Sequence, residues 1–328
     1  MEGHRKGPVC VTGGTGFVAS WLIMKLLQQG YSVHTTTRSD PDKKKDISFL
    51  TNLPGASERL QIFNADLDIP DSFDAAIAGC VGVFHVAHPM DFGDKETEET
   101  KTKRAINGTL GILKACLESK TVKRVVCTSS ASTVFGHNQG LDVIDESTWT
   151  DVDFLRDLKV VGASYTITKT LTERAALEFA EEHGLDLVTV IPALIHGPFI
   201  CPRLPGSVRT SMAMIFGDKD RYSFLVGTSL VHVDDVASAH IFLLEYPNAK
   251  GRYICSAVDI TIHEMAEFLS SRYPEYQMPT VECLKDIKGD KFNGLSSKKL
   301  LDTGFKFKHR LEDMYDGAIQ CCKEQGFI

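Results

Sequence analysis

Short apolar runs alternate with amphipathic stretches through the first 192 residues of the chain. The runs of strand length lie at residues 9–14, 31–38, 59–66, 81–87, 124–130 and 185–192. Between them, residues 98–119 and 165–184 have the spacing of long amphipathic helices. Nearly continuous apolar strands separated by helices are typical of a parallel sheet that is covered on both faces. The pattern therefore predicts an α/β fold built on a doubly wound parallel sheet.

This alternation ends at Pro192. Residues 192–207 are rich in Pro and Gly and are predicted to form a loop. A strand and a helix follow at 230–245, one more strand is predicted at 251–257, and the remainder is mostly helical. We therefore expect two domains. Residues 1–195 plus 231–257 form the larger one, and residues 196–230 plus 258–328 form the smaller, discontinuous one.

Three small residues, Gly13, Gly16 and Ala19, stand at three-residue intervals where the first strand meets the first helix. In this context the first glycine permits a tight turn, the second lets a phosphate approach the backbone, and the third small residue lets helix and strand pack closely. The helix N-terminus then offers free N–H groups to a pyrophosphate. The turn predicts a dinucleotide-binding Rossmann site, although a glycine-rich turn can also serve structure alone. The expected cofactor contacts are Gly13, Thr15, Gly16, Phe17 and Val18.

The residue that ends the second predicted strand indicates which dinucleotide is bound. Arg38 stands where a carboxylate would meet the ribose of NAD. A guanidinium can instead pair with the 2′-phosphate of NADP and stack on adenine, with help from Lys44 or Lys45. The alternative is a solvated basic turn, because Asp40 and Asp42 are near enough to weaken its charge. We favour NADPH/NADP over NAD.

Tyr165 and Lys169 are four residues apart on a predicted helix and therefore share one face. An ammonium beside a phenol stabilises the phenolate, which makes tyrosine a usable acid near neutral pH. The same spacing recurs at Tyr246 and Lys250, but a Pro and an Asn between these two favour a turn. The first pair is therefore the predicted proton donor and its partner.

A serine hydroxyl is available at the end of the preceding strand, at Ser129 or Ser130. Such a hydroxyl can donate a hydrogen bond to a substrate carbonyl. Together with the tyrosine–lysine pair it predicts an enzyme that acts on a carbonyl or alcohol group.

Composition narrows the partners of the 328-residue chain, which is 43% hydrophobic and 24% charged. A net charge of −7 argues against nucleic acid, because phosphate binding needs a basic surface. No apolar run approaches the roughly 20 residues that span a bilayer, and no signal-peptide pattern opens the sequence. The nine scattered cysteines fit neither a disulfide framework nor a zinc site, so we expect no metal. We expect a cytoplasmic protein with a small-molecule partner, and a monomer rather than an oligomer.

Seven sequence motifs resemble the extended short-chain dehydrogenase/reductases of plants, within the group of vestitone reductase, dihydroflavonol 4-reductase and anthocyanidin reductase. They are TGGTGFVAS, NADL, VFHVAHPMDF, TSSAS, YTITK, GPFICPRLPGS and VHVDDVA. The resemblance covers nearly the whole chain and implies Ser130, Tyr165 and Lys169 as the catalytic trio. It also implies further cofactor contacts: Asp66 and Leu67 at the adenine, Val86, Ala87 and Lys169 at the ribose and nicotinamide, and Pro192 closing over the ring. These add to Arg38 and Lys45 at the 2′-phosphate.

Several positions depart from the family pattern. Ala19 replaces a third glycine, and Ala105 stands where many extended members place an active-site asparagine, with Asn107 out of register. His88 replaces a Thr or Ser, and either tunes the site or fills the pocket wall. Phe135 replaces an Asn that holds substrate hydroxyls in dihydroflavonol reductases. These differences make the exact substrate the least determined feature.

The resemblance implies reduction by NADPH of a ketone on a polycyclic, flavonoid- or isoflavanone-like molecule. The smaller domain is then a substrate cap, and the expected substrate contacts are His88, Met90, Ser130, Phe135 and Tyr165. Two alternatives remain open. The enzyme could oxidise another plant secondary metabolite such as an alkaloid with NAD(P), or the chain could bind NADP without catalysis.

Overall fold

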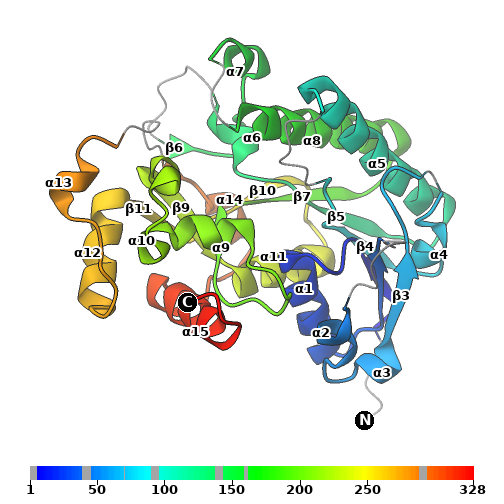
Figure 1. Ribbon diagram of the computed structural model, residues 1–328. Helices are drawn as coiled ribbons and strands as arrows, with labels where there is room; N and C mark the ends of the chain where they lie inside the picture. Colours follow the sequence, from blue (N-terminus) through cyan, green and yellow to red (C-terminus); the bar gives the residue numbers. More distant parts are fainter. Residues whose placement is uncertain are drawn as a thin grey trace.

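A parallel sheet of seven strands forms the centre of the described part of the molecule (Figure 1). The computed structural model describes residues 6–38, 46–69, 71–89, 96–136, 143–158, 162–287 and 294–328. The sheet has the order β10-β7-β5-β4-β1-β2-β3, and every neighbouring pair is parallel. Its strands are β1 (Val9–Val11), β2 (Val33–Thr37), β3 (Leu60–Asn64), β4 (Gly82–His85), β5 (Arg124–Thr128), β7 (Leu187–Pro192) and β10 (Gly251–Cys255). The predicted doubly wound α/β fold is confirmed.

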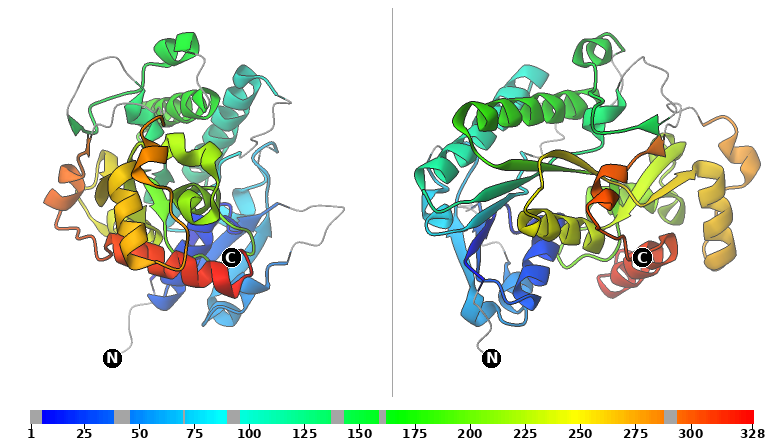
Figure 2. Two further views of the ribbon diagram at one scale, coloured as in Figure 1. Left: turned by 60° about the vertical axis from the view of Figure 1, so that its left-hand side comes forward. Right: turned by 180° about the vertical axis from the view of Figure 1, so that it is seen from behind.

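Helices cover both faces of this sheet (Figures 1 and 2). Helices α5 and α8 pack against each other on one face, and α1 and α11 on the other. The helical segments are α1 (Phe17–Gln28), α2 (Ser48–Thr51), α3 (Ala56–Arg59), α4 (Asp74–Ile77), α5 (Glu98–Glu118), α6 (Ser132–Phe135), α7 (Val152–Leu158), α8 (Ala163–His183), α9 (Gly206–Ser211), α10 (Ala213–Phe216), the 3₁₀ segment η1 (Lys219–Leu225), α11 (Val233–Glu245), α12 (Ile262–Arg272), α13 (Val281–Leu284), α14 (Lys298–Asp302) and α15 (Leu311–Glu324).

Strand β1 shows why the apolar runs are continuous. Val9 and Val11 belong to the core under α1 and α11, whereas Cys10 belongs to the core under α5 and α8. All three side chains are fully buried, because successive residues of a strand point to opposite faces. A strand covered on both faces therefore has no polar alternation.

A second, smaller sheet lies beside the central one and has the order β11-β9-β8. It consists of β8 (Leu194–His196), β9 (Gly227–His232) and β11 (Val258–Thr261), while β6 (Val143–Ile144) pairs with β12 (Gly294–Leu295). The predicted loop at 192–207 is wrong at Leu194–His196. Pro192 and Gly197, which suggested a loop, instead bound a short strand that pairs with β9.

A separate apolar core joins the small sheet to α9, α10, α12 and α15. Tyr315 of α15 is fully buried there and donates a hydrogen bond to the Ser211 carbonyl at 2.8 Å. Leu300 of α14 and Phe305, just after this helix, pack instead on the core of the central sheet. The chain thus crosses between the two cores after residue 258, and the predicted domain division stays a prediction.

Strand β10 forms one edge of the central sheet, and Lys299 of α14 lies across it. The Lys299 ammonium donates to the carbonyls of Lys250 and Arg252, at 2.9 and 2.7 Å. It also lies 4.3 Å from the centre of the Tyr253 ring. These contacts occupy two carbonyls at this edge of the sheet. Among the helices described, none is both long and apolar enough to cross a membrane.

Candidate active site

The predicted glycine turn lies at the carboxyl end of β1, beside the point where the strand order reverses between β1 and β4. Gly13 has a φ of 73°, and a Cβ there would lie 3.1 Å from the Cα of Ala87. A Cβ on Gly14 would lie only 2.2 Å from Thr35 Oγ1. Position 14 therefore also requires glycine, a requirement that was not predicted from the sequence. Gly16 precedes α1, whose first N–H groups have no side-chain cap. The turn therefore presents free donors beside a closely packed backbone, as a bound pyrophosphate requires.

A buried histidine supports the other side of this turn. Thr12 Oγ1 accepts the N–H groups of Val86 and Ala87 at 3.1 and 3.0 Å, so its own proton goes to His85 Nδ1 at 3.0 Å. His85 Nε2 then donates to Thr109 Oγ1 at 3.1 Å. Burial, and next to it the charge of Lys169, lower the pKa of His85 to about 3, so the ring stays neutral. The network holds in place the two residues expected at the ribose.

The other expected cofactor residues follow the ends of neighbouring strands. Arg38 follows β2 and is exposed. Asp66 and Leu67 follow β3: the Asp66 N–H donates to Ser72 Oγ at 3.1 Å, and Leu67 packs against Gly108 of α5. Thr15, Phe17 and Val18 lie in the turn and the first residues of α1, and Pro192 ends β7, where its carbonyl accepts the Ala131 N–H at 2.9 Å. Lys45, with the nearby Lys44, lies outside the described residues.

The predicted trio comes from two adjacent elements. Ser130 follows β5, and its Oγ accepts the Ser132 N–H at 3.2 Å. Tyr165 lies half-buried in the first turn of α8, and Lys169, one turn later, is buried with its Nζ 3.0 Å from the Thr128 carbonyl. Since Thr128 ends β5, this bond ties the tyrosine-bearing helix to the strand that leads to the serine.

Two ambiguities of the sequence are resolved by contacts. Ser129 is buried and donates its hydroxyl to Glu173 Oε2 at 2.6 Å, so Ser130 stays the predicted substrate donor of the two. Tyr246 follows the end of α11 and stacks on Phe242, and Lys250 lies in the turn before β10. The second tyrosine–lysine pair therefore does not share a helix face.

His88 lies against Tyr165, with ring centroids 6.0 Å apart and an angle of 89° between the rings. Burial, followed by the charges of Lys169 and His85, lowers the pKa of His88 to about 2. A neutral imidazole therefore borders the predicted acid. Phe135 ends α6 and is 38% exposed, so its place in the substrate pocket stays a prediction. Met90 lies outside the described residues.

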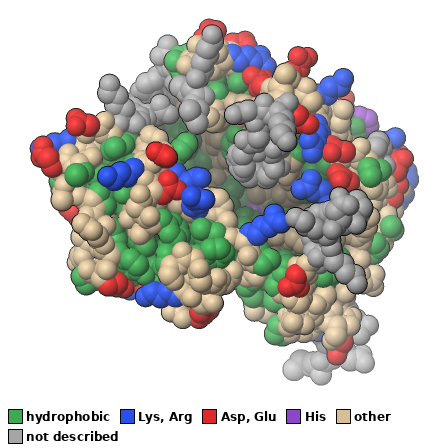
Figure 3. All heavy atoms as spheres, in the orientation of Figure 1, with side chains coloured by type: hydrophobic (Ala, Val, Ile, Leu, Met, Phe, Trp, Pro, Cys, Tyr) green, Lys and Arg blue, Asp and Glu red, His purple; other side chains and the backbone are tan. Residues whose placement is uncertain are grey.

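The face shown in Figure 3 is hollowed between the central-sheet part and the smaller part of the molecule, and Lys and Arg side chains lie along its rim. A separate cavity of about 680 Å³ opens between α4 and α5, beyond Leu67. It contains none of the trio and is lined by charged residues such as Asp71, Asp74 and Lys103.

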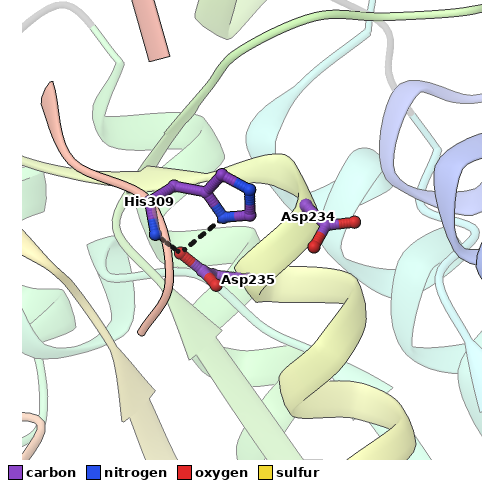
Figure 4. Close-up of side chains that lie close together, drawn as sticks. All are labelled: Asp234, Asp235 and His309. Atoms are coloured by element: carbon purple, nitrogen blue, oxygen red, sulfur yellow. Dashed lines mark hydrogen bonds and ion pairs between the residues drawn. The ribbon is translucent and has the colours of Figure 1, made fainter. Parts of the chain in front are cut away.

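Asp234, Asp235 and His309 bring possible metal-ligand atoms within 4.8 Å of one another. Figure 4 shows Asp235 facing His309, with its carboxylate receiving the His309 N–H at 3.1 Å and lying 3.2 Å from the ring Nδ1. The carboxylate of Asp234 is held instead by Lys25 and Trp21, at 2.6 and 3.0 Å. Protein groups already use these carboxylates, and the cluster fastens the C-terminal segment to α11.

The model of the family described as "NAD dependent epimerase/dehydratase family" matches residues 9–255, which include the glycine turn and the trio. The chain belongs to this family. It is 56% identical to vestitone reductase of Medicago sativa, over 98% of this chain and 99% of that protein. The crystal structure of alfalfa vestitone reductase superposes with a TM-score of 0.90 at 54% identity, covering 98% of this chain and all of that one.

Two further relatives span the same length. Dihydroflavonol 4-reductase of Zea mays is 51% identical over 98% of this chain and 90% of that protein. Noscapine synthase SDR1 of Papaver somniferum is 50% identical over 100% of this chain and 95% of that protein. The predicted family, an extended short-chain dehydrogenase/reductase, and the predicted class, an NAD(P)-dependent oxidoreductase, are confirmed.

Proposed function

We propose that this protein uses NADPH to reduce a ketone on a flavonoid- or isoflavanone-like molecule. The observation that carries the proposal is that Lys169, one turn after Tyr165 on α8, donates to the Thr128 carbonyl at the end of β5, two residues before Ser130. Vestitone reductase and dihydroflavonol 4-reductase, both at least 51% identical, support a substrate of this class. The test is turnover of a panel of flavonoid ketones, followed by the loss of NADPH absorbance and by identification of the product.

The residues present fit a dinucleotide. Gly13 and Gly14 let the turn pack closely against Ala87 and Thr35, where a Cβ would collide, and the first N–H groups of α1 lack a side-chain cap. These donors would hold the pyrophosphate, Arg38 the 2′-phosphate, and Lys169 the ribose of the nicotinamide. NADPH supplies a hydride to the carbonyl carbon when it is bound.

The chain supplies the proton and the charge stabilisation. As the carbonyl oxygen becomes an alkoxide, Tyr165 gives it a proton and Ser130 donates a hydrogen bond. The Lys169 ammonium, one helical turn away, stabilises the phenolate left on the tyrosine. The neutral ring of His88 lies at the edge of Tyr165 and adds no charge that would compete for this proton. Residues 196–230 and 258–328 are proposed to cap the substrate.

Arg38 is expected to select NADPH. Replacement by Gln removes a charge-assisted hydrogen bond, so we expect NADPH binding to weaken by about 1.5–3 kcal/mol, or roughly 10- to 150-fold in Kd. NADH lacks the 2′-phosphate and is expected to bind almost as before. Fluorescence titration with both cofactors measures the effect, and Lys123→Gln, an exposed residue at the opposite end of β5, is the control. Equal losses for NADPH and NADH would show that Arg38 is structural.

Phe135 is expected to favour less hydroxylated substrates. An amide at this position would hold substrate hydroxyls and contribute roughly 1–3 kcal/mol to binding. An aromatic ring instead stacks on a flat substrate and contributes about 0.5–1.5 kcal/mol beyond burial. We therefore expect a higher kcat/KM for vestitone than for dihydroquercetin, measured at one NADPH concentration. Phe135→Asn is expected to shift the ratio toward dihydroquercetin. A clear preference of the native protein for dihydroquercetin contradicts the proposal.

A second function is supported by the relative named noscapine synthase, which matches the full length of this chain. In that case the protein would oxidise a secondary alcohol, such as one on an alkaloid, with NAD(P). Tyr165 would then act as the base and the trio would be unchanged, because the reaction is the reverse of the reduction. Product analysis with both cofactor forms separates the two functions.

We further propose that the protein works in the cytoplasm as a monomer. Support for the compartment comes from the nine cysteines, which are all free thiols, seven of them buried. Reduced thiols are the rule where glutathione and thioredoxin act. Sedimentation analysis tests the oligomeric state, and a mass above that of one chain would contradict the proposed monomer.

A further inference from the structure

Behind the predicted active site, Glu173 and Arg252 form an ion pair that is almost completely buried. Their side chains are 2% and 7% exposed, and Arg252 Nε lies 3.1 Å from Glu173 Oε1. Glu173 belongs to α8 and Arg252 to β10, which are far apart in the sequence. A buried pair of charges is costly unless further hydrogen bonds satisfy both groups, so its other contacts are informative.

The Arg252 guanidinium uses its full set of five N–H donors. Besides the Nε contact, Nη1 donates to the carbonyls of Glu146 and Thr148 at 2.9 and 2.7 Å, and Nη2 donates to Thr133 Oγ1 at 2.9 Å and to Glu173 Oε2 at 3.3 Å. The guanidinium carbon also lies 3.5 Å from the centre of the Trp149 ring. Arg252 thereby joins the segment 146–149 to α6, the helix that begins two residues after Ser130.

Both oxygens of the Glu173 carboxylate are likewise satisfied by hydrogen bonds. Oε1 accepts the hydroxyl of Thr189 on β7, and Oε2 accepts the hydroxyl of Ser129 at the end of β5, both at 2.6 Å. Each oxygen also receives one Arg252 N–H. The carboxylate therefore holds two strands and one side chain of β10 against α8.

These contacts lie directly beside the trio. Glu173 follows Lys169 by four residues and Tyr165 by eight, which places all three on one side of α8. Ser129 is the immediate neighbour of Ser130, and Thr133 lies three residues beyond it. The ion pair thus fixes both sides of the serine-bearing segment to the helix that carries the tyrosine.

We propose that Glu173 is a positioning residue which, held by Arg252, sets the position of Ser130 relative to Tyr165 through its bond to Ser129. This rests on the proposed function, because it assigns Ser130 and Tyr165 to the reaction. Catalytic groups held rigidly in the productive geometry contribute strongly to rate, and a misplacement of about 1 Å can cost about 100-fold. The fully satisfied charges make the arrangement rigid.

Two hydroxyl deletions on the same carboxylate test the proposal. Ser129→Ala removes the bond next to Ser130, and Thr189→Val removes a bond of equal length on β7, away from it. Both variants leave the ion pair in place. We expect Ser129→Ala to lower kcat roughly tenfold, with the Kd of NADPH within about twofold of the native value. We expect both variants to lower the melting temperature by similar amounts. Thr189→Val is expected to leave kcat within about twofold of the native value.

Equal kcat values in the two variants would overturn the proposal, because the carboxylate would then act on stability alone. Glu173→Gln is expected to lower kcat more than Ser129→Ala does, but this variant can also fail to fold. The comparison of Ser129→Ala with Thr189→Val is therefore the deciding test. If the native protein reduces no ketone, the proposed function fails, and amide hydrogen exchange of residues 129–136 decides the positioning role. Ser129→Ala is expected to speed that exchange about tenfold relative to Thr189→Val, and equal rates would overturn the proposal.

Discussion

Tyr165→Phe is expected to lower kcat by about 100- to 10,000-fold, the range over which a positioned general acid contributes. The substitution removes one hydroxyl from the first turn of α8 and leaves the aromatic ring that faces His88. The glycine turn and Lys169 are unaffected, so the Kd of NADPH is expected to change little. Steady-state kinetics and a fluorescence titration of the same preparation measure both quantities.

The chain offers a matched control in Tyr246→Phe. This tyrosine also precedes a lysine by four residues, but it lies beyond the end of α11 and not on a shared helix face. Its hydroxyl is expected to be irrelevant to turnover. If Tyr165→Phe retained full activity, another group would have to supply the proton, and the neighbouring neutral His88 would be the first to replace.

Mild acid is expected to destabilise the fold strongly because His85, His196 and His240 are buried in neutral form. Desolvation is the largest cause of each shift and lowers their pKa values to about 3, 3 and 4, from 6.5. Well above pH 6.5 the rings are neutral in the folded and unfolded states and contribute nothing to the pH dependence of stability. Below it the unfolded chain binds protons that the folded protein does not, so the free energy of unfolding falls by about 1.4 kcal/mol per ring and pH unit.

At pH 5 this amounts to about 2 kcal/mol for each histidine and about 6 kcal/mol together, a large part of the stability of a typical domain. Urea unfolding at pH 7.5, 6.0 and 5.0 measures the dependence. His196→Gln is expected to reduce the slope by about 1.4 kcal/mol per pH unit below pH 6.5. Stability that stays constant between pH 7.5 and 5.0 would contradict the expectation.

The central sheet and the shared helix face of Tyr165 and Lys169 were predictable because their signals are local. An apolar run such as Val9–Val11 reports burial on both faces, and Tyr165 and Lys169 are one helical turn apart in any register. The strand at Leu194–His196 was missed because it is stabilised by pairing with β9, more than 30 residues later, and not by its own pattern.

Gly14 and the Glu173–Arg252 pair were not predicted, for a related reason. The need for glycine at 14 comes from Thr35 on another strand, and the partner of Glu173 is 79 residues away. A charged residue on the helix face that carries Lys169 was a usable signal, since an acid buried there requires a cation. Which cation it finds is decided by the sheet order, which places β10 beside β7.

Lys299 has a consequence for association between molecules. An edge strand normally offers a row of unpaired carbonyl and N–H groups, onto which a strand of another molecule can add. Along this edge, the carbonyls of Lys250, just before β10, and of Arg252 are already bonded to the Lys299 ammonium. An incoming strand would have to displace a charged group that also contacts the Tyr253 ring. This edge of the sheet is therefore protected against intermolecular strand addition, the step from which sheet-based aggregates grow.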